Sequence, residues 1–156
     1  MIRLEVLQVS RLQGSDECLL VLRERDGERL LPITIGQFEA HAIAQAAHRV
    51  TTARPLTHDL LAMVVSRLRA TLERVVIHDL RDETFYCQLE LSGERGLLEI
   101  DCRTSDAVAL ALRTDSPIFA TEEVVKGAAV PPRQRPDAAG AELEGEVGDG
   151  GPDPVG

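Results

Sequence analysis

The stretch IDCRTSDAVALALR, residues 100–113, is the most informative part of this chain. It starts as the end of a strand and continues as the apolar run of a short helix that is expected to be buried on most sides. A hydroxyl at the join, from Thr104 or Ser105, can cap the helix, and a carboxylate in its first turn lies at the positive end of the helix dipole. The charged residues at the join are Asp101, Arg103 and Asp106. The stretch therefore predicts a charged cluster held rigidly at the start of a buried helix.

Each of these residues also has an ordinary structural explanation. Asp106 would be a first-turn carboxylate that stabilises its helix by ~0.3–1 kcal/mol. Asp101 and Arg103 would form a strand-end ion pair worth ~0–1 kcal/mol. The functional interpretation therefore depends on polar residues elsewhere in the chain.

Length and composition favour one domain with an aliphatic core. The chain has 156 residues, 44% of them hydrophobic, only 3% aromatic and none of them Trp. Cys18, Cys87 and Cys102 show no CxxC spacing, which argues against a disulfide framework or a zinc site and favours buried thiols in a reducing compartment. No apolar run has the length of a membrane span, and no signal peptide pattern is present. We therefore expect a cytoplasmic protein with no membrane partner.

The composition changes after Lys126. Residues 127–156 contain seven Gly, five Pro, six acidic residues and two Arg. Such a segment cannot bury enough apolar surface to offset its ordering entropy. We therefore predict a single compact domain over residues 1–126 and a disordered acidic tail over residues 127–156. Of the net charge of −9, the tail carries −4 and the domain −5.

Strand and helix patterns come in runs along the domain. The predicted strands are residues 2–9, 18–25, 28–35, 72–79, 84–91, 97–101 and 118–119, with Asp26-Gly27 as a two-residue hairpin turn. The predicted helices are residues 36–50, residues 57–70 and the helix opened by Ser105, with a last helical turn at 122–126. Runs of strands with helices between them predict an α+β fold, a mostly antiparallel sheet with three inserted helices.

Polar residues stand at the starts of all three predicted helices, where backbone N–H groups favour anions. Glu39 enters with the first helix, His58 and Asp59 with the second, and residues 101–106 with the third. If the starts converge, one pocket holds carboxylates for a divalent metal, an imidazole for proton transfer and an arginine for phosphate. Singly, Glu39 is also explained as a solvated charge, His58 as a surface residue and Asp59 as part of a helix cap.

Four sequence blocks carry a family resemblance. They are LPITIGQFEAHAIA (31–44), RPLTHDLL (54–61), TFYCQLEL (84–91) and IDCRTSDAVALALRTDSPIF (100–119). In this order and spacing they resemble the bifunctional nuclease domain family, over about residues 2–126. The resemblance implies an α+β domain with charged residues on one face and, for some members, nuclease activity on both DNA and RNA. Thr104 stands where the family usually has proline, and Asp82-Glu83 where it usually has Asp-Gly.

By position, the family's charged set matches Glu39, His58, Asp59, Asp101, Arg103, Ser105 and Asp106. The first hypothesis is therefore a metal-assisted nuclease that hydrolyses phosphodiester bonds of DNA or RNA. Its catalytic residues would be His58, Asp59, Asp101, Arg103 and Asp106. Its ligands for Mg²⁺ or Mn²⁺ would be Asp59, Asp101, Asp106 and Glu39. Its substrate-binding residues would be Arg103, Ser105 and Arg54. The negative charge and the few aromatic residues predict weak, unspecific binding of nucleic acid.

Two alternatives stay open. A non-catalytic dimeric binding or regulatory module would use the same charged face for a protein partner or a small anion. A hydrolase of a smaller phosphorylated metabolite would explain a metal site without a basic groove. The alanine-rich helix over residues 36–50 and the edge strands offer apolar surface, and the resemblance points to dimers, so we predict a symmetric homodimer.

Overall fold

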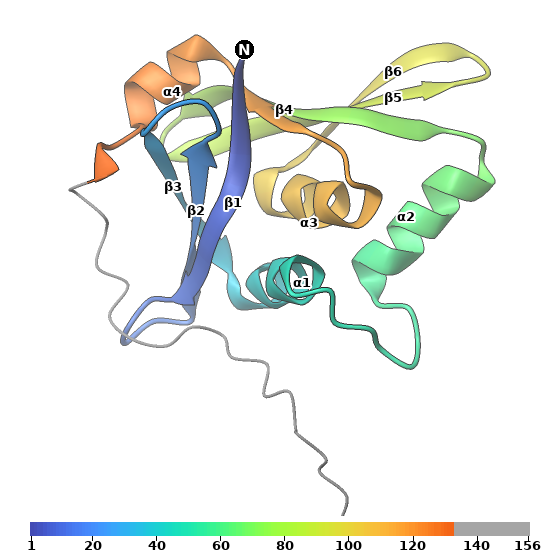
Figure 1. Cartoon of the computed structure of the whole chain (residues 1–156), viewed down its shortest axis with the longest axis horizontal. Helices are drawn as coiled ribbons and strands as arrows, with labels where there is room; N and C mark the ends of the chain where they lie inside the picture. The colour runs from blue at the N-terminus through green and yellow to red at the C-terminus, as the bar shows by residue number, and fades with distance from the viewer. Residues whose placement is uncertain (133–156) are drawn as a thin grey trace, which may run out of the picture.

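Seven strands and four helices build the domain in a computed structural model that describes residues 1–132 (Figure 1). The strands are β1 (Ile2–Arg11), β2 (Glu17–Glu24), β3 (Leu30–Gly36), β4 (Thr71–Arg81), β5 (Thr84–Gly93), β6 (Gly96–Arg103) and β7 (Ile118–Ala120). The helices are α1 (Gln37–Ala47), α2 (Thr57–Arg67), α3 (Thr104–Thr114) and α4 (Glu122–Ala128). The predicted α+β fold is confirmed, and the predicted last helical turn is a fourth helix. None of the helices within residues 1–132 is long and apolar enough to cross a membrane.

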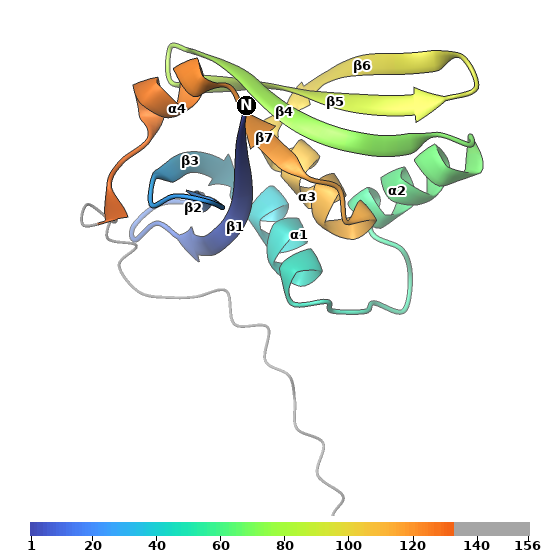
Figure 2. The same cartoon turned by 45° about the horizontal axis from the view of Figure 1, so that its top comes forward.

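All seven strands form one sheet in the order β3-β2-β1-β7-β4-β5-β6. Every neighbouring pair is antiparallel except β4 and β7, which are parallel. The short strand β7 joins the two halves, because residues 2–4 pair with one of its edges and residues 75–77 with the other. The sheet curls around α1 and α3, so both helices lie on its inner side (Figures 1 and 2). The curl brings the starts of these helices to the same region of the molecule.

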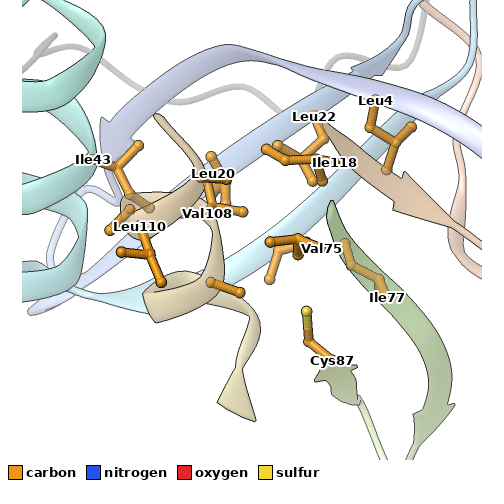
Figure 3. Close-up of a cluster of buried hydrophobic side chains, with 14 of the residues drawn as sticks. Leu4, Leu20, Leu22, Ile43, Val75, Ile77, Cys87, Val108, Leu110 and Ile118 are labelled. Carbon is orange, nitrogen blue, oxygen red and sulfur yellow. The ribbon is translucent and has the colours of Figure 1, made fainter. Parts of the chain in front are cut away.

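Helix α3 lies at the centre of the core. Its residues 107–111 are all fully buried, as the apolar run predicts, and they pack against both halves of the sheet and against α1. Figure 3 shows Val108 and Leu110 among aliphatic side chains from β2, β4 and α1. The buried hydrophobic residues in the described part of the chain include no aromatic side chain. A helix enclosed on all sides fixes the position of the polar residues at its start.

The start of α3 differs from the sequence expectation. Arg103 is the residue that precedes the helix, and no side chain caps it. Thr104 and Ser105 are the first two helical residues, and both are buried. The hydroxyl of Thr104 forms no hydrogen bond within residues 1–132. The expected cap by Thr104 or Ser105 is wrong, because the helix begins one residue earlier and carries both hydroxyl residues into the interior.

The folded chain continues past Lys126. Helix α4 ends at Ala128, and Val130 and Leu30 exchange two backbone hydrogen bonds, at 2.8 and 2.9 Å. Val130 also packs against a small apolar cluster that includes Leu19 and Val21. The domain boundary that the composition placed at Lys126 therefore falls inside α4. The rest of the predicted tail, residues 133–156, lies outside the described residues.

Candidate functional site

Four side chains from three helix starts form one connected network, which we call the helix-start cluster: Glu39, His58, Arg103 and Asp106. Arg103 Nε donates to Asp106 Oδ2 at 2.7 Å, and Arg103 Nη2 donates to Glu39 Oε1 at 3.1 Å. The other Asp106 oxygen, Oδ1, lies 2.9 Å from His58 Nε2. Arg103 thus links α1 to α3, and Asp106 links α3 to α2. The structure brings these four predicted residues together.

The backbone around Glu39 gives its carboxylate room to reach Arg103. Glu39 lies in the first turn of α1 and folds back over Gly36, the residue that precedes the helix. A Cβ atom at Gly36 would lie 2.3 Å from Glu39 Oε2, far closer than two such atoms can approach. A residue without a side chain at the end of β3 therefore allows the carboxylate to lie where it meets the guanidinium.

His58 is the one buried residue of α2, and its ring orientation follows from its partner. Arg103 and His58 hold the pKa of Asp106 below its usual value: burial opposes ionisation, but the hydrogen bonds from these two residues outweigh it. An ionised carboxylate can only accept hydrogen bonds, so His58 Nε2 carries the proton that points at Asp106. The other ring nitrogen, Nδ1, then has a free lone pair and can accept a proton.

Arg103 is the exposed member of the cluster. Its side chain is 67% exposed, although it binds two carboxylates. The hydrogen bond to Asp106 raises the pKa of Arg103, so the guanidinium is charged at any physiological pH. The cluster therefore presents a solvent-accessible cation beside a carboxylate–imidazole pair. An anion that reaches this surface can bind to Arg103 directly.

Asp59 lies outside the cluster although it follows His58 in the sequence. Its Oδ1 accepts a hydrogen bond from Arg113 Nε at 2.6 Å, and its Oδ2 accepts one from the backbone N–H of Leu56 at 2.9 Å. The Leu56 N–H, followed by Arg113, lowers the pKa of Asp59. Both of its oxygens are thus used within the protein. A pocket of about 180 Å³ lies beside this ion pair.

Three further predicted residues also lie apart from the cluster. Asp101 is exposed on β6, opposite Gln88 of β5, and its side chain forms no hydrogen bond or ion pair within residues 1–132. Ser105 is buried in the first turn of α3. Arg54 is exposed in the connection between α1 and α2, where only its backbone carbonyl is bonded, to the hydroxyl of Thr52.

The predicted metal ligands do not meet. Asp59 binds Arg113, Asp101 points from an edge strand, and the guanidinium of Arg103 bonds to both remaining carboxylates, Glu39 and Asp106. In the part of the chain that the structure describes, no three His, Cys, Asp or Glu side chains are arranged to hold a metal ion. As folded, this donor set does not fit Mg²⁺ or Mn²⁺, because a positive group already bridges its two closest oxygen donors.

Sequence reasoning missed two residues that the structure singles out. The first is Phe38, the neighbour of Glu39, which is 79% exposed at the start of α1. A large aromatic residue within a predicted alanine-rich helix was the sequence signal that could have drawn attention to Phe38. The second is Arg113, whose partner in the folded protein lies 54 residues earlier in the chain. No local pattern could have shown that pairing.

A large apolar surface flanks the cluster. We call it the α2–β6 face, and its members are 39–74% exposed: Leu60, Leu61, Met63, Val64, Leu68, Leu97, Leu98 and Ile100. The apolar stripe of residues 57–70 thus covers the core only in part. Both figures place α2 and the β5–β6 hairpin at the same end of the molecule (Figures 1 and 2). Exposed apolar side chains that gather at one end of a molecule are typical of an interaction site.

The fold and the cluster define an α+β domain in which an acid–base pair and an exposed arginine meet at three helix starts. The chain belongs to the bifunctional nuclease domain family, whose model matches residues 20–133. Two Mycobacterium tuberculosis proteins are also similar: the uncharacterized protein MT1877 of strain CDC 1551 and the uncharacterized protein Rv1829 of strain H37Rv. Each is 40% identical to this chain over 137 residues, which cover 86% of this chain and 82% of the relative.

Proposed function

We propose that this protein is a nuclease that hydrolyses phosphodiester bonds of DNA or RNA. The observation that carries the proposal is the His58–Asp106 pair beside the exposed Arg103, in a chain that belongs to the bifunctional nuclease domain family. A general base and a phosphate-binding cation are two groups with which protein side chains can promote the hydrolysis of a phosphodiester.

In the proposed mechanism, His58 Nδ1 accepts a proton as a water oxygen attacks the phosphorus. Asp106 stabilises the imidazolium that forms, because its carboxylate lies 2.9 Å from Nε2. Arg103 exchanges a protein carboxylate for a phosphate oxygen and neutralises the charge that develops there. The bond from phosphorus to the leaving oxygen then breaks, and that oxygen takes up the proton from His58. Glu39 holds Arg103 in place before the substrate arrives.

Dependence on Mg²⁺ or Mn²⁺ stays part of the proposal, but no step is assigned to a metal. Cleavage assays with added EDTA, and with each cation restored, test it directly. Full activity in EDTA would remove the metal from the proposal and leave the roles of His58 and Arg103 in place.

The central test compares two aspartates that stand five residues apart. Asp106→Asn removes the partner of His58 at nearly constant volume, and we expect cleavage of a labelled oligonucleotide to fall by ~10²–10⁴-fold. Asp101→Asn is the matched control, because Asp101 is exposed and forms no hydrogen bond or ion pair among the described residues. Its activity should match that of the unchanged protein. Equal cleavage by both variants and the unchanged protein would overturn the mechanism.

We also propose that two copies meet through the α2–β6 face, as a symmetric homodimer. The strand β6 is at the edge of the sheet and carries exposed leucines, an arrangement that invites pairing with another chain. A stable dimer buries about 800 Å² on each partner, and the eight exposed, mostly leucine-sized side chains at this end of the molecule are of that order. A non-catalytic dimeric module is the alternative that this face favours.

Light scattering tests the dimer. The unchanged protein should have twice the chain mass of 17.0 kDa at micromolar concentration, and Leu98→Asp should return it to the mass of one chain. Val50→Asp is the matched control, since Val50 is also exposed but lies outside the α2–β6 face. A single-chain mass for the unchanged protein would overturn the proposal.

A further inference from the structure

Phe38 is the most exposed large apolar side chain within residues 1–132. It lies in the first turn of α1, one residue before Glu39, whose carboxylate binds Arg103 of the helix-start cluster. Phe85 and Phe119, the other two phenylalanines, are both partly buried in strands. Packing therefore accounts for two of the three phenyl rings and leaves the third in solvent beside the candidate active site.

A second ring accompanies Phe38 on the same helix. His41 is also exposed and follows three residues later, and residues three apart lie on the same side of an α-helix. The α2–β6 face belongs to other elements, α2 and the edge strand, so it does not explain this exposure. The start of α1 thus presents two exposed aromatic rings on the turn that also carries Glu39, the carboxylate that binds Arg103.

We propose that Phe38 is a base-stacking platform of the nucleic-acid site, with His41 as a second contact; this inference rests on the proposed nuclease function. A base stacks on the phenyl ring while a neighbouring phosphate binds Arg103. Stacking on an aromatic ring requires an unpaired base, because a base inside a duplex is already stacked between its neighbours. The substrate class is therefore single-stranded DNA or RNA. Stacking also tolerates any base, which fits binding without sequence preference.

The absence of tryptophan from the sequence provides a direct binding assay. Phe38→Trp places the only indole of the protein at the proposed platform, where stacking with a base quenches its fluorescence. The probes are a thymidine oligonucleotide and an abasic strand of the same length and charge. Val50→Trp is the control, because Val50 is exposed beyond the opposite end of α1 from Phe38 and lies outside the α2–β6 face.

We expect the thymidine strand to quench the Phe38→Trp protein and the abasic strand to leave it unchanged, with neither strand affecting the Val50→Trp protein. No quenching of Phe38→Trp, or equal quenching by the abasic strand, would overturn the platform. Equal quenching by a fully paired duplex would overturn the assignment to single strands.

Kinetics separate the platform from the catalytic steps. Phe38→Ala should raise KM for a single strand by ~5- to 100-fold, the range of one lost stacking contact, and leave kcat nearly unchanged. Phe38→Tyr should restore KM, since tyrosine keeps the aromatic ring. A fall in kcat with unchanged KM, or a change in the light-scattering mass of Phe38→Ala, would assign Phe38 to another role and overturn the proposal.

The two proposals fail in different ways. If the Phe38→Trp protein is quenched by the base-bearing strand but the unchanged protein cleaves nothing, the nuclease function is wrong and the binding platform stands. If the protein cleaves single strands but Phe38→Trp is not quenched, the platform is wrong and the nuclease function stands.

Discussion

The two ends of α3 carry the same kind of ion pair in opposite settings. At its start, Arg103 binds Glu39 and Asp106, and its side chain is 67% exposed. In its last turn, Arg113 binds Asp59 and also donates to the backbone carbonyls of Ala42 and Ala109, with a side chain only 9% exposed. Arg113 has protein acceptors on every side and ties α1, α2 and α3 together. The proposed function has Arg103 exchange an acceptor for a substrate phosphate. Burial, rather than residue type, separates the structural arginine from the one proposed to bind substrate.

Replacement of the buried arginine should have the largest effect on stability. Arg113→Met leaves Asp59 without its cation and removes the side-chain donor to two helix carbonyls, so we expect the free energy of unfolding to fall by ~2 kcal/mol or more. Urea unfolding followed by circular dichroism measures the change. Arg103→Met is the matched control and should cost about 1 kcal/mol or less. Equal losses in the two variants would contradict the distinction between them.

Replacement of the exposed arginine should affect activity instead. Arg103→Gln removes the proposed phosphate contact, and we expect cleavage to fall by ~10²–10³-fold with little change in urea midpoint. Arg103→Lys should recover part of the activity, because it keeps the charge but not the paired donor geometry. Full cleavage by Arg103→Gln would show that the phosphate binds elsewhere.

The loss of stability at acid pH should also differ between the carboxylates at the two ends of α3. Asp59 and Asp106 both have a pKa that is lowered in the folded protein. Each carboxylate therefore stabilises the fold at a pH above the ordinary Asp pKa of ~3.9. This contribution is lost as the pH falls through the pKa of the folded state. Stability should therefore be flat above about pH 5 and fall below about pH 4. Asp59→Asn should reduce the loss of stability at low pH more than Asp106→Asn does. The reason is that burial opposes the effect of Arg103 and His58 on the pKa of Asp106. Urea midpoints from pH 2 to 7 test this order; the reverse order would contradict it.

The smallest expected effect concerns the support of Arg103. Gly36→Ala places a methyl group where the Glu39 carboxylate lies, so this flexible side chain must move away from Arg103. We expect a loss of activity of about threefold to tenfold and a change in stability below about 1 kcal/mol. Glu39→Gln should give a similar loss. Unchanged activity in both would show that Arg103 needs no support from α1.

The sequence predicted the helices and strands better than it predicted which residues bind one another. Residues 100–113 form the strand–helix join that their pattern indicates, but His58 and Asp59 bind different partners, Asp106 and Arg113, which no local pattern shows. The two-residue turn at Asp26-Gly27 is wrong: the register pairs Arg23 with Leu30, and the connection between β2 and β3 is longer. The pairing of Val130 with β3 was not predicted, because the composition of residues 127–156 as a whole does not show that one valine pairs with a strand.

The register of β7 has a consequence for how the chain folds during synthesis. Its residues 118–120 are the only described residues that pair with both β1 and β4, so the sheet cannot close until nearly the whole domain has left the ribosome. Until then, two separate half-sheets expose the edges that β7 later covers. Contacts between residues so far apart in sequence slow folding and prolong exposure of unpaired edges. A three-residue strand thus sets the earliest moment at which the two halves of the sheet can join.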